Sequence, residues 1–171
     1  LVGSEMCIRD RCVPDEPSPR LAIMEKSFPG SCVVNRDGKR FANESQNYMA
    51  FQKDLFKTHT DEHPNAPAWH VFDATFRENF MVGPLMTKSM KADFQIPKKW
   101  FDTGFVAKAN SIRELADALG INADGLEETI ANMNRYAQTG TDEEFGRGDS
   151  AYDRYYADPA IKPNPCLAPS V

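Results

Sequence analysis

The acid that follows two short apolar runs is the first candidate for chemistry in this chain. Residues 32–34 and 39–41 are typical of strands, and residues 35–38 (Asn-Arg-Asp-Gly) are typical of a tight turn. Gly at positive φ closes such a two-residue turn without strain. Asn43 and Glu44 then lie just past the second run, where loops tend to carry function. The alternative interpretation is an ordinary surface hairpin.

A second candidate is the segment from Phe145 to Tyr156, which holds three tyrosines, two arginines and several aspartates around flexible glycines. Pairing of its arginines with carboxylates, together with tyrosine hydroxyls, would knit a rigid loop. The favoured interpretation is a loop that locks the end of a helical pair, and direct catalysis is the alternative. The tripeptide Arg147-Gly148-Asp149 also occurs by chance in many proteins, so it carries no weight here.

Metal and nucleotide sites have weaker support. His59 and His63 have the i, i+4 spacing of a helical metal site, but they lie in a polar segment ending in proline with no third ligand nearby, which favours a solvated loop. The chain contains no GxGxxG, GxSxG or P-loop motif. Its four cysteines, at positions 7, 12, 32 and 166, have no CxxC spacing, so lone thiols in a reducing cytoplasm are the default expectation.

Several elements must position these residues. Residues 46–57 suit a short helix, 68–73 a buried strand that ends in an acid, 74–80 a helical turn and 105–107 a short strand. Ser111 to Glu114 forms a capping box that opens a helix ended by Gly120. A second helix, capped by Asn122 or Asp124, runs to about residue 138, with apolar residues on one face that belong to the core.

Size and composition limit the possible functions. The chain has 171 residues, of which 41% are apolar and 26% charged, as expected for a globular domain with a real core. The net charge of −5 argues against a nucleic-acid surface, and no apolar run is long enough to span a membrane. Residues 1–11 resemble a translated sequencing-adapter read-through, and we exclude them from the fold prediction. The abrupt proline-rich end, residues 163–169, indicates an internal fragment of a longer protein.

Taken together, the motifs resemble a known family. The stretch PGSCVVNRDGKRFANES (29–45) is similar to a segment of FAD-dependent oxidoreductases of the fumarate reductase/succinate dehydrogenase flavoprotein superfamily. WHVFD (69–73), the helix pair and TGTDEEFGRGDSAYDRYYADPAIKPNPCLAP (139–169) resemble the 3-ketosteroid dehydrogenase-like branch. The resemblance covers about residues 20 to 169.

The resemblance implies an α+β fold: a capping (catalytic) domain fragment with a hairpin remnant of a Rossmann-like FAD domain. Residues 12–48 would belong to the FAD domain, 49–155 to the cap, and 156–171 to a connector back towards the FAD domain. The cofactor would be FAD, which carries the redox chemistry. The reaction would move a hydride between flavin and a CH–CH group of an apolar, steroid-like substrate, and a separate electron acceptor would complete the cycle.

The resemblance also implies site residues. Glu44 matches the glutamate that helps relay protons in fumarate reductases, and Arg77 follows residues 72–73 at about the interval of an acid-donating arginine. Asn43 and Glu44 would approach the cofactor. Phe76 and Phe80 stand where ketosteroid dehydrogenases supply a tyrosine, and phenylalanine has no hydroxyl to exchange a proton. Both rings suit an apolar substrate, and cap core is the alternative interpretation.

Two alternative functions remain. A flavoprotein reductase for a small dicarboxylate would need several cationic side chains converging on the substrate, and only Arg77 is well placed. A non-enzymatic α+β binding module would explain why no complete catalytic constellation is visible.

Overall fold

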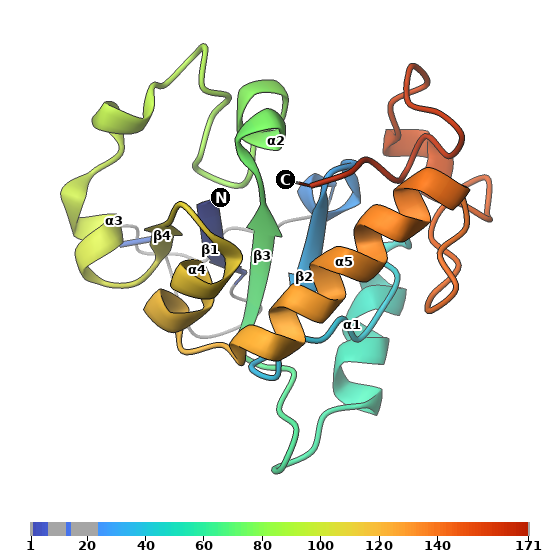
Figure 1. The fold of residues 1–171 in the computed structure, drawn as a ribbon, viewed down its shortest axis with the longest axis horizontal. Helices are drawn as coiled ribbons and strands as arrows, with labels where there is room; N and C mark the ends of the chain where they lie inside the picture. Colours follow the sequence, from blue (N-terminus) through green and yellow to red (C-terminus); the bar gives the residue numbers. More distant parts are fainter. Residues whose placement is uncertain (1, 7–12, 15–23, 171) are drawn as a thin grey trace.

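The protein is built on one antiparallel sheet with helices on both faces (Figure 1). The structure, a computed structural model, describes residues 2–6, 13–14 and 24–170. The strand order is β2-β3-β1-β4, with every neighbouring pair antiparallel. The fold is therefore a mixture of helices and a small sheet, in agreement with the α+β prediction at that level.

The elements follow one another along the chain in this order: β1 (Val2–Met6), η1 (Glu25–Ser27), β2 (Ser31–Val34), α1 (Tyr48–Lys57), β3 (Ala68–Phe72), α2 (Ala74–Asn79), η2 (Asp93–Gln95), α3 (Lys98–Asp102), β4 (Val106–Lys108), α4 (Ile112–Leu119), α5 (Ala123–Thr139) and η3 (Asp153–Tyr156). The elements marked η are short 3-10 helices. No helix in the described ranges is both long and apolar enough to cross a lipid bilayer.

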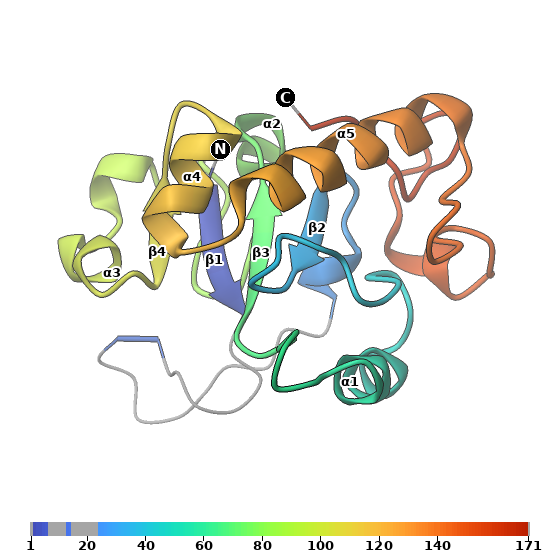
Figure 2. The same cartoon turned by 60° about the horizontal axis from the view of Figure 1, so that its bottom comes forward.

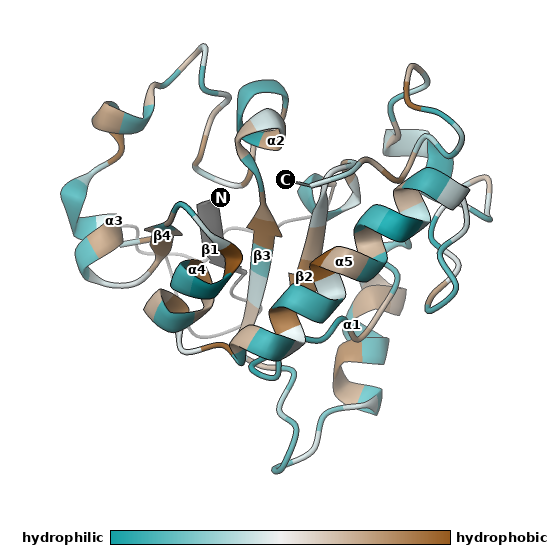
Figure 3. Cartoon of the chain, viewed as in Figure 1, coloured by the Kyte–Doolittle hydropathy of each residue, from teal (hydrophilic) through white to brown (hydrophobic). Residues whose placement is uncertain are grey.

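One face of the sheet is covered by α4 and α5, which cross the strands in both views (Figures 1 and 2). Successive side chains of a strand point to opposite faces. Cys32, Val34, Trp69 and Val71 therefore pack together against these helices, in a core that includes Leu115, Leu126, Ile130 and Met133. Figure 3 shows the corresponding pattern, with brown strands under helices whose outer sides are teal. The apolar faces of the two predicted helices therefore pack in the core, as predicted.

The opposite face carries two smaller cores. Val33 and Ala68 pack with Phe51 and Leu55 of α1 in one of them. The other joins Phe72 to residues of α2, of α3 and of the segments that flank α3, including Phe76, Leu85, Trp100 and Phe105. The predicted helix at 46–57 is confirmed, and its Tyr48 and Phe56 are 41% and 60% exposed. Only its Phe51 and Leu55 reach the sheet.

The ends of α4 match the prediction closely. The Ser111 hydroxyl accepts a hydrogen bond from the Glu114 amide at 3.2 Å, and Gly120 ends the helix at φ +69°. The Glu114 carboxylate reaches back one residue further than a standard capping box requires, to the Asn110 amide at 3.1 Å. The N-terminal cap at Ser111 and the C-terminal stop at Gly120 are both confirmed.

The turn after β2 differs from the prediction. The Gly38 amide donates to the Asn35 carbonyl at 3.0 Å and the Asn35 amide to the Lys39 carbonyl at 2.9 Å, which leaves a three-residue loop rather than two. Gly38 takes the positive φ expected of it, +73°. The predicted second strand is reduced to a single bridge between Val34 and Arg40. The chain leaves the sheet there because Arg40 turns into a buried charged cluster and Phe41 packs on Phe51, 5.4 Å between ring centroids.

This turn is seated on the first turns of α5. The Asn122 amide donates to the Arg36 carbonyl at 2.9 Å, and the Thr129 hydroxyl donates to the Gly38 carbonyl at 2.6 Å. Gly125 lies against the Asp37 carbonyl so closely that a Cβ there would fall well inside van der Waals contact with its oxygen. A glycine within a helix is thus required by the close approach of another segment.

Two predicted boundaries can be compared with this sheet. Residues 1–11 were set aside as foreign, yet Val2–Met6 forms β1 between β3 and β4. The foreign origin of the segment stays a prediction.

The predicted domain boundary at residue 48 falls within this sheet. Strand β2 lies before the boundary, whereas β3 and β4 lie after it, and all three belong to one sheet. The partition into FAD-domain and cap segments also stays a prediction. Most of the proline-rich segment 12–28 lies outside the described residues.

The close approach at Gly125 predicts whether replacing this glycine by alanine raises or lowers the free energy of unfolding. Helix propensity alone makes Gly125→Ala stabilising by about 1 kcal/mol. The added methyl group must displace the Asp37 carbonyl, so we expect a net destabilisation of about 1–3 kcal/mol. Urea unfolding followed by circular dichroism measures the difference, with the exposed Gln138→Ala in the same helix as control. A stabilised Gly125→Ala variant would contradict the seating of the turn on α5.

Candidate functional site

Glu44 lies at the centre of a buried charged cluster, and its side chain is completely enclosed. Oε1 accepts hydrogen bonds from the Val33 amide at 3.2 Å and from Arg40 Nε at 2.9 Å. Oε2 accepts from Arg40 Nη2 at 2.7 Å and from Arg147 Nη1 at 3.4 Å. Burial alone would raise the pKa of Glu44, but the two guanidinium groups hold it below its ordinary value. The carboxylate is therefore ionised, with both oxygens occupied.

Arg40 joins Glu44 to a second buried acid. Its guanidinium binds Asp142 through two parallel hydrogen bonds, Nη1 to Oδ1 at 3.0 Å and Nη2 to Oδ2 at 2.8 Å, and Nη1 also reaches Glu144 at 3.3 Å. Together with the two bonds to Glu44, all five N–H donors of Arg40 have acceptors. Burial opposes the charge, yet the carboxylates of Glu44 and Asp142 raise the pKa of Arg40. Bidentate arginine–carboxylate pairs of this kind fix the relative orientation of the two side chains and also strengthen their attraction.

Arg147 is the other cation of the cluster, and its side chain is fully buried. Its donors reach backbone carbonyls: Nη1 that of Ser31 at 2.7 Å, and Nη2 those of Ser27 at 3.2 Å and Phe28 at 2.9 Å. Nε donates to the Ser45 hydroxyl at 3.0 Å, and Nη1 also faces Glu44. The guanidinium thus connects the loop after α5 to η1 and to the start of β2.

A third cation, Lys26, completes one side of the cluster. Its ammonium donates to the backbone carbonyls of Glu44 at 2.7 Å and Gln46 at 2.6 Å and lies over the Phe51 ring, 5.1 Å from the centroid. Burial lowers the pKa of Lys26 to about 8, although the charge of Glu44 opposes this. Two arginines and a lysine are thereby gathered around two buried acids.

The loop at 145–156 is ordered by this cluster. Asp153 Oδ2 accepts from Asn43 Nδ2 at 3.0 Å and from the Gly148 amide at 2.9 Å, and its Oδ1 accepts from the Ser150 hydroxyl at 2.7 Å. The predicted arginine–carboxylate pairing is confirmed, but the partner of Arg147 is Glu44 rather than an acid of its own loop. The predicted tyrosine contribution is not seen at two positions, since Tyr152 and Tyr155 are 46% and 76% exposed.

Arg77 belongs to a different part of the molecule. It is buried on α2, where Nη2 donates to the Lys91 carbonyl at 2.7 Å, Nη1 donates to the Met86 carbonyl, and Nε lies 3.5 Å from Asp93 Oδ1. Within the described ranges, no hydrogen bond or ion pair links Arg77 to Glu44. The structure therefore places the two predicted catalytic residues in separate sets of contacts, and their catalytic roles stay predictions.

Phe76 and Phe80 form part of a row of aromatic rings. Centroid distances are 4.8 Å from Phe28 to Phe80, 5.1 Å from Phe80 to Phe76 and 5.1 Å from Phe76 to Phe72. Phe76 is 2% exposed, whereas Phe28 and Phe80 are half-buried at the outer end of the row. Of the two predicted substrate residues, Phe80 is the one that a ligand can reach without rearrangement.

His70 lies at the inner end of this row and was not predicted as a site residue. It is completely buried on β3, with its ring edge-on to Phe72 and Phe76 at 5.5 and 5.7 Å. Neither ring nitrogen has a hydrogen-bond partner among the described residues. Burial, reinforced by the charge of Arg147, lowers the pKa of His70 to about 3. A single polar residue inside the apolar strand sequence AWHVF was the available signal.

The histidines and cysteines considered as weaker candidates lie in two kinds of environment. His59 and His63 are exposed, and the His63 ring contacts Asp37 at 2.7 Å. No group of three or more potential metal ligands occurs within the described residues. Cys32 and Cys166 are buried free thiols, and burial raises the pKa of Cys32 to about 12. Cys7 and Cys12 lie outside the described residues.

FAD, the predicted cofactor, is not accommodated by the predicted cofactor residues as they stand. Glu44 is enclosed with both oxygens occupied, and Asn43 uses its amide on Asp153 and on the Ser45 amide at 2.8 Å. The sequence also lacks a glycine-rich loop that would cradle the phosphates. Within the part of the chain that the structure describes, the side chains of Asn43 and Glu44 are thus occupied by protein partners, and their role toward FAD stays a prediction.

Comparison with known proteins identifies the class of protein to which this sheet and cluster belong. A family model described as "FAD binding domain" matches residues 12–170. Because the match covers nearly the whole chain, the chain belongs to this family of flavoprotein domains.

Individual relatives narrow the comparison. The chain is 40% identical over 159 residues to a 3-oxosteroid 1-dehydrogenase of Mycolicibacterium smegmatis, covering 91% of this chain and 27% of the relative. It is 36% identical over 156 residues to a 4-oxocyclohexanecarboxylate 2-dehydrogenase of Sinomonas cyclohexanicum, covering 90% and 25%.

A solved structure agrees with these matches. The 3-ketosteroid delta1-dehydrogenase of Sterolibacterium denitrificans, solved with 1,4-androstadiene-3,17-dione, superposes with a TM-score of 0.86 at 37% identity. The match covers 99% of this chain and 29% of that one. The chain therefore spans about a quarter of the length of the relatives it matches.

The buried position of Arg147 predicts a large effect of its loss. Arg147→Met leaves Glu44 and three carbonyls without their donor, and we expect destabilisation of about 3–5 kcal/mol. Arg147→Lys should restore little of the lost stability, because one ammonium group cannot reach all the acceptors arranged around the planar guanidinium group. Urea unfolding measures both variants, with Arg135→Met, which removes an exposed pair with Glu143, as the control that leaves the midpoint unchanged. Equal stability of Arg147→Lys and the parent would refute the role assigned to the fork.

His70 predicts how stability depends on pH. Its folded-state pKa of about 3 lies below the ordinary 6.5, so between these values the unfolded chain binds a proton that the folded chain does not. Stability therefore falls as pH decreases through this window, by about 1.4 kcal/mol per pH unit from this group. His70→Leu should flatten the decline by that amount. Identical slopes for His70→Leu and the parent in urea unfolding across this window would contradict the assignment.

Proposed function

We propose that this chain is part of an FAD-dependent dehydrogenase that acts on a CH–CH group of an apolar, steroid-like cyclic ketone. The observation that carries the proposal is 40% identity to a 3-oxosteroid 1-dehydrogenase over 91% of the chain, together with the TM-score of 0.86 to a ketosteroid dehydrogenase. The structural match covers 99% of the chain rather than one motif. Bound FAD would accept the hydride, and it would be held chiefly by parts of the full-length protein outside this chain.

Within that protein we propose the predicted partition, with residues 12–48 as a segment of the FAD domain, 49–155 as the capping domain and 156–171 as the connector. The buried cluster supports a framework role for the junction between these segments. Arg147, in the second proposed segment, donates to carbonyls at residues 27–31 in the first. Arg40, in the first segment, pairs with Glu44 and also with Asp142 in the second. Each guanidinium thus connects the first proposed segment to the second.

We propose that the outer end of the aromatic row is the surface that the substrate contacts. Phe80 is half-buried, stacks on Phe28 and rests on the buried Phe76, so its position is determined by packing. An apolar ring face of this kind suits the flat hydrocarbon face of a steroid. Phe80 cannot transfer a proton, so in this proposal a group elsewhere in the full-length protein performs that step.

The alternative, a dicarboxylate reductase, finds less support in the described residues. It needs guanidinium groups that are available to a substrate. Arg40 and Arg147 have all their donors occupied, and Arg77 binds two carbonyls and approaches Asp93. Likewise, the ionised and enclosed state of Glu44 favours an anchoring role over a proton relay. A non-enzymatic module would not account for dehydrogenase relatives over the whole chain.

The full-length protein tests the proposal. It should purify with bound FAD and reduce an artificial electron acceptor when given a 3-ketosteroid. Fumarate and 4-oxocyclohexanecarboxylate, offered in parallel, distinguish the alternatives by size and charge. A protein without flavin, or one active only with a dicarboxylate, would overturn the proposed function.

A substitution in the same protein tests the substrate surface. Phe80→Ala removes the half-buried ring at the outer end of the row, and we expect KM for a 3-ketosteroid to rise roughly 10- to 100-fold, from the apolar contact area lost. Phe56→Ala removes an exposed phenylalanine, on α1, and should leave KM unchanged. Equal KM values for the two variants would place the substrate elsewhere.

A further inference from the structure

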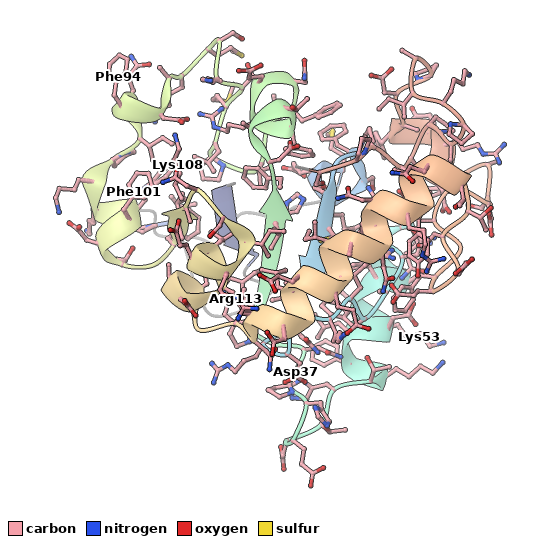
Figure 4. All side chains as sticks on the ribbon, viewed as in Figure 1. Asp37, Lys53, Phe94, Phe101, Lys108 and Arg113 are labelled. Atoms are coloured by element: carbon pink, nitrogen blue, oxygen red, sulfur yellow. The ribbon has the colours of Figure 1, made fainter. Side chains whose placement is uncertain are left out.

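A second surface, at the end of the molecule formed by η2 and α3, is not used by the proposed function. Phe94 is 88% exposed, Met90 66% and Phe101 36%, all within the segment between α2 and β4. Figure 4 shows Phe94 projecting from this end, away from the sheet. Lys88, Lys98 and Lys99 are also exposed here, and the ammonium groups of Lys88 and Lys98 form surface ion pairs with Glu78 and Asp102 that lipid phosphates would have to displace. We call these six residues the basic–aromatic patch.

The exposure of Phe94 is built into an ordered turn. The Gln95 amide donates to the Ala92 carbonyl at 2.9 Å, and the Ala92 amide donates to Gln95 Oε1 at 2.9 Å. On the inner side, Ile96 and Trp100 are buried in the core. The short helix η2 therefore holds the Phe94 ring outward while its neighbours are fixed inward, so collapse of the ring onto the protein is prevented.

Arg77 fixes the other end of the patch. Its guanidinium donates to the carbonyls of Met86 and Lys91, and the Lys88 amide donates to the Arg77 carbonyl at 3.0 Å. Met90 lies between these anchored positions. The segment thus presents apolar side chains from a backbone that is held at several points.

The charge of the segment is opposite to that of the chain. Residues 87–102 contain four lysines and two aspartates, a net charge of +2 in a chain of net charge −5. Another surface with exposed apolar side chains, α1 and the loop after it, has two lysines and three acids over residues 48–63, a net charge of −1. Only the first surface combines apolar exposure with positive charge. Apolar side chains among lysines are typical of surfaces that bind the headgroup region of anionic bilayers.

We propose that the basic–aromatic patch docks the protein on an anionic lipid surface, with Phe94 inserted among the headgroups and the lysines facing lipid phosphates or carboxylates. This contact is peripheral. An apolar cyclic ketone partitions into membranes, so docking would bring the enzyme to its substrate. This benefit rests on the proposed function, whereas the membrane contact itself does not. The remainder of the full-length protein is the competing occupant of the patch.

Vesicle sedimentation of the full-length flavoprotein tests the proposal. We expect binding to phosphatidylcholine vesicles that contain phosphatidylserine, weak binding to phosphatidylcholine alone, and loss of binding at high salt. Phe94→Ala should lower affinity about tenfold or more. Lys98→Gln with Lys99→Gln should lower it roughly 30-fold at low salt.

Helix α1 supplies matched controls on another part of the molecule, where Figure 4 labels Lys53. Phe56→Ala, and Lys53→Gln with Lys57→Gln, remove the same groups and should leave binding unchanged. Equal effects of patch and control variants would overturn the proposal, as would absence of binding to phosphatidylserine vesicles. Dye reduction with soluble 3-ketosteroid should persist in every patch variant, which separates this outcome from failure of the proposed function.

Discussion

The burial of the Arg147 guanidinium is the constraint on which the rest of this structure depends. A buried guanidinium must find an acceptor for each of its five N–H groups, because an unsatisfied charged donor costs several kcal/mol. Arg147 finds them in the carbonyls of Ser27, Phe28 and Ser31, the hydroxyl of Ser45 and the carboxylate of Glu44. These acceptors converge only if η1, the start of β2 and the loop after α5 lie together. One side chain therefore defines how residues 27–31 meet the loop after α5.

Arg40 extends this constraint and determines the character of Glu44. Because Arg40 pairs with both Glu44 and Asp142, neither acid is left to bind a proton or a ligand readily, and the pKa of each is lowered. Buried ion pairs of this kind contribute more to a unique geometry than to net stability. The cluster is best understood as a framework that holds the sheet edge in place, and the surfaces that we propose for ligands, the aromatic row and the basic–aromatic patch, lie elsewhere.

Arg77 connects those two surfaces. It lies on the same short helix as Phe76, and its guanidinium holds the segment that carries Met90 and leads to Phe94. A residue that sequence comparison suggests as an acid donor thus has, in the described structure, the contacts of an organising residue. Its position places a rigid ring face on one side of α2 and an exposed, positively charged segment on the other.

The sequence by itself determined the features that depend on near neighbours. Ser111 and Gly120 set the ends of α4, and the positive φ of Gly38 could be read from its place in an Asn-Arg-Asp-Gly turn, because capping and turn geometry involve only a few consecutive residues. Only the tertiary structure decided what Glu44 does. Its partner Arg147 lies 103 residues away, and a carboxylate becomes an exposed acid or a buried anion according to which distant cations fold against it.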